Sequence, residues 1–478
     1  MPYDDLRSFL DRLDQEGELL RVKREVDWNL ELSHVAKVNE ERQGGGKALL
    51  FEHIKDYPGH RVFTSALTAR ERLALALEMP PDTSLMHLSQ EWVERIHGNM
   101  VPPVEVDRSD APTKENVLVG DDAKLSKIPA PWFYPLDGGR YFGTAGYAIT
   151  RNLETGRLNL GTYRAMIKDD DKLCVYMIKG KDGEIDHRAY EEAGIPMPIA
   201  YVSGADPTLF MCGSTLFGLE ESEYDVAGAL RGAPVKVVEA ETSDLLVPAA
   251  AEWVVEGVMM PGERIAEGPF GEYTGHYSGK GDEPTYFMHV QAITHRTEPI
   301  LWSTTVGRPT TDTHMVMGVN RTASLWNDLK RAQIPGIKAV YGPPPSAGRM
   351  LAIISMRPMY PGHSTQVALA AFASTTGNYG LKTVIVVDED IDPENMDQVL
   401  YAMSFKFQPG FGSQVLHRGR STPLDPSLPR SARFLTNRLI IDCTTPYEWP
   451  EEERPIPIRL DPEMERFVRD HWEEYVGG

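Results

Sequence analysis

Cysteine is scarce in this chain, with three residues in 478 (Cys174, Cys212 and Cys443) and no CxxC pair. The sequence therefore offers neither a disulfide framework nor a cysteine-rich zinc site, and we expect buried, reduced thiols in a cytoplasmic protein. The thirteen histidines form no HExxH motif and no His-x-His pair, which argues against a dedicated zinc site. A GxSxG elbow, a kinase-type loop and a nicotinamide-type GxGxxG are also missing.

Positive charge is in deficit as well, because 49 Lys and Arg face 70 Asp and Glu and give a formal net charge of −21. A nucleic-acid-binding protein needs a basic face, so we expect no nucleic-acid partner. An anionic ligand stays possible, since a local cationic pocket can lie inside an acidic protein.

Long hydrophobic runs are absent, which argues against a membrane span. The most apolar window, Val247–Met260, is interrupted by Glu252 and Glu256 and is too short to cross a bilayer. The first residues are acidic and include no apolar stretch, unlike a secretory signal. We therefore expect no membrane partner.

The composition, with 41% hydrophobic and 25% charged residues, is that of an ordinary globular protein of two to four domains. Apolar residues from Leu6 to Leu13 recur on one face of a helix, which Gly17 would end, and Leu19–Val22 is typical of a strand. The segment 44–47 (GGGK) lacks the spacing of a phosphate-binding loop and is interpreted as a flexible connector.

The predicted secondary structure then changes twice along the chain. Helical patterns over 70–97 and a proline-rich connector at 128–132 precede short, glycine-punctuated β runs from 141 to about 300, as in a barrel or sandwich. After residue 310 the pattern becomes α/β. Met350–Ser355 and Thr383–Val387 are continuous apolar runs of parallel-strand type, separated by a helix-compatible Thr365–Ser374.

The last thirty residues form an acidic, proline-rich stretch (449–457) followed by a predicted helix that Asp461 and Pro462 begin. Apolar residues recur on one face of this helix: Met464, Phe467, Val468, Trp472 and Tyr475. We expect this apolar face to pack against another surface, either of its own subunit or of a partner subunit. The extended segment 449–457 before the helix favours the partner subunit.

The most informative motif is the segment 267–277 (EGPFGEYTGHY). Its glycines, proline and aromatic residues indicate a backbone held in a tightly turned shape. A reversal there could bring Glu267 and Glu272 to one point, where repulsion would raise one pKa into the range useful for proton transfer. The alternative is a β-turn with two solvated acids.

Two further segments could contribute to a site. In the first, 159–164 (NLGTYR), an arginine at a strand end could hold a carboxylate or a phosphate, or could be a surface residue at a sheet edge. In the second, 221–229 (ESEYDVAGA), Glu223 could be a metal ligand or could simply complement the dipole of a helix.

Together these segments resemble the UbiD family of reversible (de)carboxylases, which use prenylated FMN. Further matching segments are Gly17–Leu20 and 382–390 (KTVIVVDED), and the resemblance runs from about residue 3 to about residue 446. The form of the 267–277 motif leans toward the vanillate and 4-hydroxybenzoate decarboxylases of the family. The pocket determinants that would choose the acid are expected in Trp302–Met317 and Phe405–Ser413.

The resemblance implies roles for individual residues. Arg164, Glu267 and Glu272 match the family's catalytic network, with Glu272 as the proton donor to the carbon that loses CO2. Asn159 and Glu223 match ligands of Mn²⁺ or Mg²⁺, which clamps the cofactor phosphate, with K⁺ often nearby. The complete set expected to bind prenylated FMN is Asn159, Thr162, Tyr163, Arg164, Lys181, Ser214, Glu223 and Lys382.

One departure from the family pattern concerns the metal. Family members usually place a metal-ligating His about seventeen residues after the arginine, whereas this chain has Lys181 and Asp182 there and no His before His187. Lys181 could contact the phosphate directly, or Asp182 or His187 could replace the missing ligand. We expect that a metal still binds.

The implied fold is multidomain α/β. It comprises an N-terminal α/β subdomain (1–115), a central split β-barrel that binds the flavin (116–310), a C-terminal α/β domain (311–448) and a tail with an oligomerisation helix (449–478). The active site is expected in the cleft between barrel and C-terminal domain, with hinge closure.

The implied activity is non-oxidative decarboxylation of an aryl or acrylic acid by a homodimer or homohexamer, with a flavin prenyltransferase as cofactor supplier. The alternatives are a flavin-dependent oxidoreductase and a non-catalytic subunit of a larger carboxylase.

Overall fold

The computed structural model describes residues 3–215, 217, 221–458 and 460–476. Its N-terminal part begins with α1 (Leu6–Gln15), which Asp5 caps by accepting a hydrogen bond from the backbone N–H of Ser8. The helix buries its apolar face, and Gly17 follows it in a left-handed conformation, as predicted.

A four-stranded sheet lies beside this helix in the order β1 (Leu19–Val22), β2 (Ala48–Phe51), β3 (Arg61–Thr64) and β19 (Ile300–Trp302). The predicted strand at Leu19–Val22 is confirmed. β19 comes from the far end of the central part of the chain, so the N-terminal and central parts share a sheet. The helices of this region are α2 (Glu31–Glu40), α3 (Arg70–Ala76) and α4 (Leu85–Ile96). The segment 44–47 joins α2 to β2 through a short 3-10 helix (Gln43–Gly45).

The central part of the chain is β-rich, as predicted, and its main sheet follows the order β6–β9–β10–β18–β14–β11–β7–β8, with β5 and β15 also paired to β18. In chain order these strands are β5 (Asn116–Val119), β6 (Tyr141–Gly143), β7 (Gly146–Arg151), β8 (Leu158–Gly161), β9 (Ala165–Asp169), β10 (Lys172–Val175), β11 (Met197–Ser203), β14 (Trp253–Met259), β15 (Ile265–Glu267) and β18 (Glu283–His295). The pairing runs from β6 to β8 without closing among the described strands, so the split barrel stays a prediction.

Smaller elements complete this part of the chain. The helices are α5 (Asp182–Ala193), α6 (Pro207–Gly213) and α7 (Glu223–Arg231), and β4 (Val104–Glu105), β12 (Lys236–Glu239) and β13 (Leu246–Pro248) form a small sheet. The strands β16 (Phe270–Gly271) and β17 (Tyr277–Ser278) form a hairpin from the 267–277 motif and the next residue.

Short 3-10 helices occur along the chain at Arg108–Asp110, Pro112–Lys114, Gly120–Asp122, Leu125–Lys127, Pro344–Ser346, Arg430–Ala432 and Glu451–Glu453.

The C-terminal part begins with the long helix α8 (Asp312–Arg331) and contains a five-stranded sheet in the order β20–β21–β22–β24–β23. The strands are β20 (Ile337–Tyr341), β21 (Leu351–Met356), β22 (Thr383–Asp388), β23 (Ser413–Arg420) and β24 (Leu435–Cys443), and the helices are α9 (His363–Ala373) and α10 (Met396–Phe405). β21 and β22 are parallel and α9 connects them, which confirms the α/β prediction for this region.

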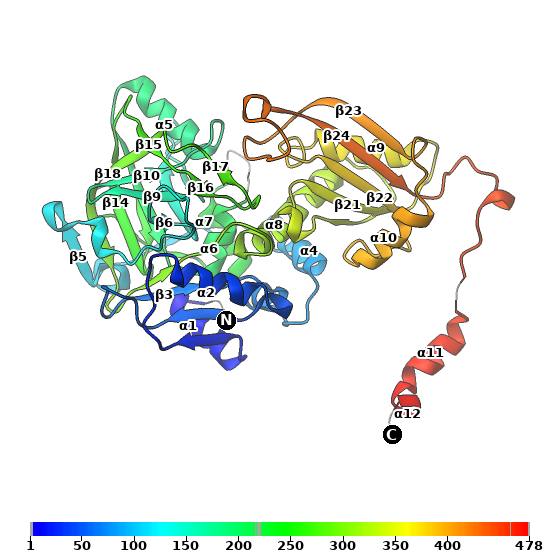
Figure 1. Cartoon of the computed structure of the whole chain (residues 1–478), viewed down its shortest axis with the longest axis horizontal. Helices are drawn as coiled ribbons and strands as arrows, with labels where there is room; N and C mark the ends of the chain where they lie inside the picture. Colours follow the sequence, from blue (N-terminus) through cyan, green and yellow to red (C-terminus); the bar gives the residue numbers. More distant parts are fainter. Residues whose placement is uncertain (1–2, 216, 218–220, 459, 477–478) are drawn as a thin grey trace.

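α8 lies between the green β-rich body and the yellow and orange C-terminal sheet (Figure 1). It packs against α4 and against β20, and Asn320 on it donates to Ser214 of the central part, so it contacts all three parts of the chain. Residues along one side of α8 also reach the cavity described below.

The tail leaves this body as an extended segment and ends in α11 (Pro462–Asp470) and α12 (Trp472–Val476) (Figure 1). Asp461 caps α11 and Pro462 is its first residue, as predicted. The apolar stripe stays exposed within the chain, with 49% of Phe467 and 55% of Trp472 accessible to solvent. The tail therefore does not dock on its own subunit in this structure.

No helix of the described residues combines the length and the apolar character that a membrane crossing requires.

Two buried carboxyl groups lie where α2 meets the start of α8. Glu40 accepts hydrogen bonds from Ser65 and Thr305, and Asp312 accepts one from the backbone N–H of Leu67 at 2.6 Å. Burial, reinforced by the charge of Glu40, raises the pKa of Asp312 to about 7. The folded chain therefore holds a proton on Asp312 at pH values where the unfolded chain has lost it.

Because the folded state binds this extra proton, the free energy of unfolding falls as pH rises from the pKa of Asp312 in the unfolded chain to about 7. Asp312→Asn keeps the oxygen acceptor but cannot ionise. We predict that the decrease in the free energy of unfolding between pH 4 and pH 8 is smaller in this variant by on the order of 3 kcal/mol. Urea unfolding at several pH values measures it, with the exposed Asp107→Asn as the control. An unchanged pH dependence in Asp312→Asn would contradict the assignment.

Candidate active site

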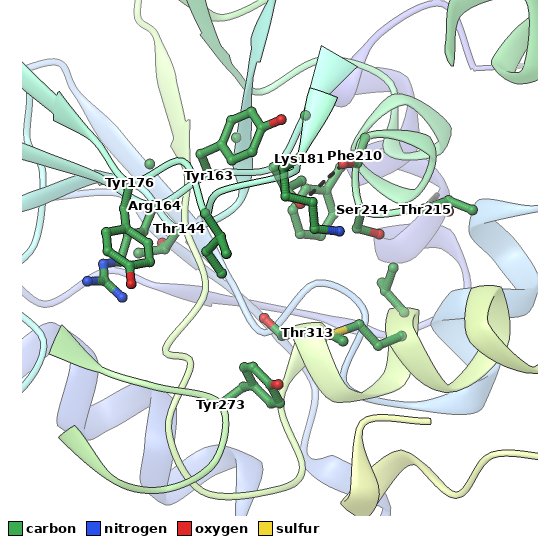
Figure 2. Close-up of a pocket in the computed structure, with 18 of the residues that line it drawn as sticks. Thr144, Tyr163, Arg164, Tyr176, Lys181, Phe210, Ser214, Thr215, Tyr273 and Thr313 are labelled. Atoms are coloured by element: carbon green, nitrogen blue, oxygen red, sulfur yellow. Dashed lines mark hydrogen bonds between the residues drawn. The ribbon is translucent and has the colours of Figure 1, made fainter. Parts of the chain in front are cut away.

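A cavity opens between the central sheet and α8, and it gathers most of the residues that the sequence singled out (Figure 2). From the central part it is lined by Asn159, Thr162, Tyr163, Arg164, Tyr176, Lys181, Asp182, Ser214, Glu223, Phe270, Glu272 and Tyr273, among others. From the C-terminal part it is lined by Thr313, Val316, Met317, Arg321, Arg349, Tyr379 and Leu424. The cavity lies where the sequence analysis expected the active site, between the central and C-terminal parts.

Arg164 is the centre of this site. It follows the turn after β8, and its guanidinium donates from Nε to Glu267 Oε1 at 2.8 Å and from Nη2 to Glu267 Oε2 at 2.7 Å. The remaining nitrogen, Nη1, donates to Glu272 and to the hydroxyl of Ser278. The guanidinium also lies over the ring of Tyr176, with its carbon 3.8 Å from the ring centre. One buried arginine therefore holds two carboxylates.

The two carboxylates differ in what they face. Glu267 takes both ends of a bidentate pair and also accepts a hydrogen bond from the hydroxyl of Tyr141 at 2.9 Å. It lies behind Arg164, outside the residues that line the cavity. Glu272 has one arginine contact and one from Ser278, and it lines the cavity directly. Only Glu272 can therefore reach a bound molecule.

The electrostatics of Glu272 suit proton transfer. Burial raises its pKa, Arg164 and Ser278 act in the opposite direction, and the charge of Glu267 adds to the rise. The expectation that one of the two acids has a raised pKa is thus supported, and burial contributes more to it than repulsion does. The alternative of two solvated acids is excluded, because both side chains are at least nine-tenths buried.

The hairpin that presents Glu272 is braced from two sides. Asp137 accepts a hydrogen bond from the backbone N–H of Gly271 at 2.9 Å, and Gly138 approaches Gly268 so closely that a side chain at position 138 would overlap its carbonyl. From the other side, the ring of His314 on α8 hydrogen-bonds the carbonyl of Tyr273 through Nε2 at 2.7 Å. The turned backbone predicted from the sequence is therefore fixed by the chain on both of its faces.

Side-chain oxygens that could ligate a metal lie together in another part of the cavity lining. Asn159, on β8, is buried and donates to Thr150 at 3.0 Å, and Glu223, at the start of α7, accepts from the N–H of Leu160 at 3.0 Å. Burial raises the pKa of Glu223 to about 7. Asp182 is the second carboxylate there, 3.6 Å from Arg157. No cluster of three His, Cys, Asp or Glu side chains suited to a metal occurs in the described ranges.

Three positive side chains line the cavity without an ion pair to any residue that the structure describes. Lys181 is part of the lining and forms no ion pair with any residue that the structure describes, and burial lowers its pKa well below the usual value. Arg321 and Arg349 also line the cavity and form no ion pair with a described residue, and the sequence analysis did not identify either of them. The sequence signal for Arg321 was an arginine in the stretch 315–325 (MVMGVNRTASL), whose other residues, apart from Asn320, are apolar or small.

Other expected residues lie elsewhere. Lys382 does not line the cavity: it forms an ion pair with Asp425 at 3.1 Å and donates to Ser427 at 2.7 Å. His187 is buried against the ring of Tyr286, so it does not take the place of the missing metal ligand in this structure.

The segments expected to shape the pocket divide in the same way. Val306, Thr313, Val316 and Met317 lie within Trp302–Met317 and line the cavity. None of Phe405–Ser413 lines it, and the prediction for that segment is wrong in this structure because it lies on the outer part of the C-terminal domain, with Phe405 exposed.

Comparison with sequence families places the whole chain in one family. Residues 10–92, 104–309 and 314–443 match the N-terminal, Rift-related and C-terminal domains of 3-octaprenyl-4-hydroxybenzoate carboxy-lyase, UbiD. A phenolic acid decarboxylase of Bacillus subtilis is 34% identical over 453 residues, which cover 93% of each chain. A phenolic acid decarboxylase of Sedimentibacter hydroxybenzoicus is 33% identical over 481 residues, which cover 99% of this chain and 97% of the relative.

Solved structures agree with the sequence families. Vanillic acid decarboxylase of Sedimentibacter hydroxybenzoicus, in its open form, superimposes with a TM-score of 0.90 at 32% identity over the full length of both chains. The UbiD-class enzyme HmfF from Pelotomaculum thermopropionicum, in complex with prFMN, superimposes with a TM-score of 0.81 at 28% identity, over 97% of this chain and 98% of that one. The resemblance seen in the sequence motifs is confirmed: the chain belongs to the UbiD family and is a carboxy-lyase of the UbiD type.

Proposed function

We propose that this protein catalyses the reversible, non-oxidative decarboxylation of an aromatic or α,β-unsaturated acid with prenylated FMN, and that Glu272 is the proton donor. The observation that carries the proposal is the unequal use of Arg164, which pairs fully with Glu267 and leaves Glu272 on the cavity wall. The names of the relatives, which are phenolic and vanillic acid decarboxylases, support an aryl acid.

The residues of the cavity fit the cofactor. A flavin phosphate brings negative charge, and the lining offers Lys181 without an acidic partner among the described residues, together with the hydroxyls of Thr162 and Ser214. Tyr163, which lies beside these groups, would contribute an aromatic wall. When bound, prenylated FMN supplies an electrophilic centre that accepts the electron pair of the carbon–carbon bond that breaks. Lys382, which pairs with Asp425 outside the cavity in this structure, is proposed as a further phosphate contact in a more closed form.

The protein's own residues then carry out one proton transfer. After CO2 has left, the ring or alkene carbon that carried it requires a proton, and Glu272 delivers its proton to that carbon. The resulting Glu272 carboxylate is stabilised by Arg164 Nη1 and Ser278, which already contact it. In the carboxylation direction Glu272 takes the proton back. Glu267 keeps Arg164 oriented, and the buried site excludes water that would otherwise compete as a proton donor.

Two alternatives are weaker. A flavin oxidoreductase transferring hydride has no need of two carboxylates on one buried arginine, and a non-catalytic subunit has no need of an acid facing an open cavity. NAD(P)H oxidation without CO2 release would favour the reductase.

We predict that Glu272→Gln retains the flavin but lowers CO2 release from 4-hydroxybenzoate or vanillate by about 100-fold or more, because the amide cannot donate a proton to carbon. The protein is produced with a flavin prenyltransferase, its bound flavin is measured by absorbance, and CO2 is assayed over a panel of aryl acids. The exposed Glu283→Gln is the control, with unchanged activity. Decarboxylation at the wild-type rate in Glu272→Gln would show that the assigned acid is wrong.

A divalent metal, Mn²⁺ or Mg²⁺, is proposed at Asn159 and Glu223, with K⁺ nearby. The fit rests on the donors: an amide and a buried carboxylate on neighbouring elements, with Asp182 in the same lining, are hard oxygen ligands that become a sufficient set once a phosphate completes them. A metal there would also offset the cost of burying the charge of Glu223.

We predict that elemental analysis of the flavin-loaded protein finds Mn or Mg near one per chain and that Glu223→Gln loses most of it. Retention of the flavin is followed in the same samples. The presence of neither metal in loaded wild-type protein would overturn the proposal and would leave the phosphate to Lys181.

Homo-oligomerisation through the tail is proposed because α11 carries an apolar stripe that nothing else in the described chain covers. We predict that Phe467→Glu together with Trp472→Glu lowers the mass measured by light scattering from that of a dimer or hexamer toward that of the monomer. Glu465→Gln, on the same helix, is the control. An unchanged mass in the double variant would contradict this use of the tail.

A further inference from the structure

Tyr141 carries a buried hydroxyl group to which the mechanism above assigns no role. It is the first residue of β6, its side chain is fully buried, and it does not line the cavity. Its hydroxyl lies 2.9 Å from Glu267 Oε1 and 3.2 Å from the carbonyl oxygen of Pro269. The hydroxyl has a single hydrogen, and an ionised carboxylate is both the nearer and the stronger acceptor, so Tyr141 donates to Glu267.

The central sheet brings Tyr141 and Arg164 to the same carboxyl group. β6 pairs with β9, and Arg164 directly precedes β9. Glu267 ends β15, and its Oε1 receives both the hydroxyl of Tyr141 and the Nε of Arg164, the latter at 2.8 Å. The ring of Tyr141 packs against that of Phe270, with 4.4 Å between the ring centres. The hydroxyl therefore reaches Glu267 from a position that strand pairing and packing both fix.

The two acids of the site differ in the hydrogen bonds that they receive. Glu267 accepts from Nε and Nη2 of Arg164 and from Tyr141. Within the described chain, Glu272 accepts from Nη1 of Arg164 and, at 3.2 Å, from the hydroxyl of Ser278. A hydrogen bond to a carboxylate stabilises its ionised form. The contacts therefore favour an ionised Glu267 and a protonated Glu272.

The buried pair has a physical reason to share one proton. Two ionised carboxylates and one guanidinium leave a net negative charge inside the protein, whereas one proton makes the group neutral. Carboxyl groups that interact this closely titrate together, and the hydrogen bonds to each of them set which one holds the proton. The location matters because Glu272 lines the cavity and Glu267 does not. A proton held on Glu267 could not reach the substrate directly.

We propose that Tyr141 is a positioning residue for this proton: by donating to Glu267 it keeps that carboxyl group ionised and leaves the shared proton on Glu272. This inference rests on the proposed function and deepens it, since it names the residue that sets where the catalytic proton is held. Burial and the charge of Glu267 raise the pKa of Tyr141, so its hydroxyl stays a donor at neutral pH.

Other titratable groups near the two acids do not replace this contact. They are Asp137, Lys168, Cys174, Tyr176, Tyr273, Glu283 and Arg349. Lys168 and Glu283 are exposed, so salt and water screen their charges, and burial raises the pKa values of Cys174, Tyr176 and Tyr273, which keeps all three neutral at pH 7. Asp137, whose pKa burial raises to about 6, accepts from the backbone N–H groups of Gly271 and Tyr134. As far as the structure describes the chain, none of these groups donates to either carboxyl group.

The test locates the proton by infrared difference spectroscopy, which requires no turnover. Tyr141→Phe, produced with a flavin prenyltransferase, is compared at neutral pH with Tyr141→Phe/Glu272→Gln and with Tyr141→Phe/Glu267→Gln. We expect the proton to shift from Glu272 toward Glu267 by about 10- to 100-fold, because a hydrogen bond to a charged group is lost. The protonated-carboxyl band that Glu272→Gln removes should weaken, and a band that Glu267→Gln removes should appear.

The pH dependence of activity gives a second readout. With its proton on Glu267, Tyr141→Phe should release CO2 about 10-fold more slowly than the wild type at neutral pH. It should regain rate as pH falls, because Glu272 then takes up a second proton. Ser278→Ala removes a donor from Glu272 instead, so the Glu272 band should persist to a pH about one unit higher than in the wild type. Loosened packing would not produce shifts of opposite sign.

The control is Tyr57→Phe, which removes a hydroxyl that donates to the carbonyl of Ser126 at 2.9 Å, and we expect the wild-type band and pH profile. Bound flavin and the melting temperature are measured for every variant. If Tyr141→Phe does not fold, fluorotyrosine at position 141 replaces it; as a stronger donor, it should extend the Glu272 band to higher pH.

A proton that stays on Glu272 in Tyr141→Phe, or a rate that falls equally at every pH without movement of the band, would overturn the assignment. The second result would reduce Tyr141 to a packing residue. Absence of CO2 release from every acid by the wild-type protein would instead refute the proposed function, and the infrared comparison would still locate the proton.

Discussion

The site depends on one side chain, Arg164, which is shared by two carboxylates inside a desolvated pocket. A buried arginine shared by two acids is stable only when each contact is made, and here it donates to Glu267 from two nitrogens and to Glu272 from the third. The inequality of the two contacts separates their roles: one acid is a permanent counter-ion and the other can exchange a proton. The surrounding hairpin, braced by Asp137 and His314, keeps that inequality in place.

The arrangement of the cavity explains how a chain with a negative net charge can bind anions. A protein with a formal charge of −21 places Lys181, Arg321 and Arg349 around one cavity without acidic partners among the described residues. Cations that repel one another across a cleft favour the binding of anions, and a cofactor phosphate and an acidic substrate would supply them. A relative, the vanillic acid decarboxylase of Sedimentibacter hydroxybenzoicus, has been solved in both open and closed forms.

Much of this could be predicted from the sequence because the signals were local. The amphipathic spacing of α1, the apolar runs of β21 and β22, and the cap of α11 each depend on a few neighbouring residues. The 267–277 motif pointed to Glu267 and Glu272 for the same reason, since a turn brings near neighbours together. Family resemblance added Arg164, which lies more than a hundred residues away along the chain.

What the sequence could not provide depended on long-range packing. Arg349 becomes part of the site only because the start of β21 faces Tyr273, and Arg321 only because one side of α8 faces the cavity. Lys382 matched a family position, yet in this structure it pairs with Asp425 outside the cavity. The strand β19 joins the N-terminal sheet through a pairing that no local pattern announces.

The central claim is that burial, against the opposing charge of Arg164, makes Glu272 an acid that keeps its proton to higher pH than usual. Infrared difference spectroscopy between the wild-type protein and Glu272→Gln, recorded across a pH titration, isolates the carboxyl carbonyl band of this one residue. The account predicts a protonated-acid band that persists above the pH at which a solvent-exposed glutamic acid ionises. A band that disappears at or below that ordinary pH would contradict it.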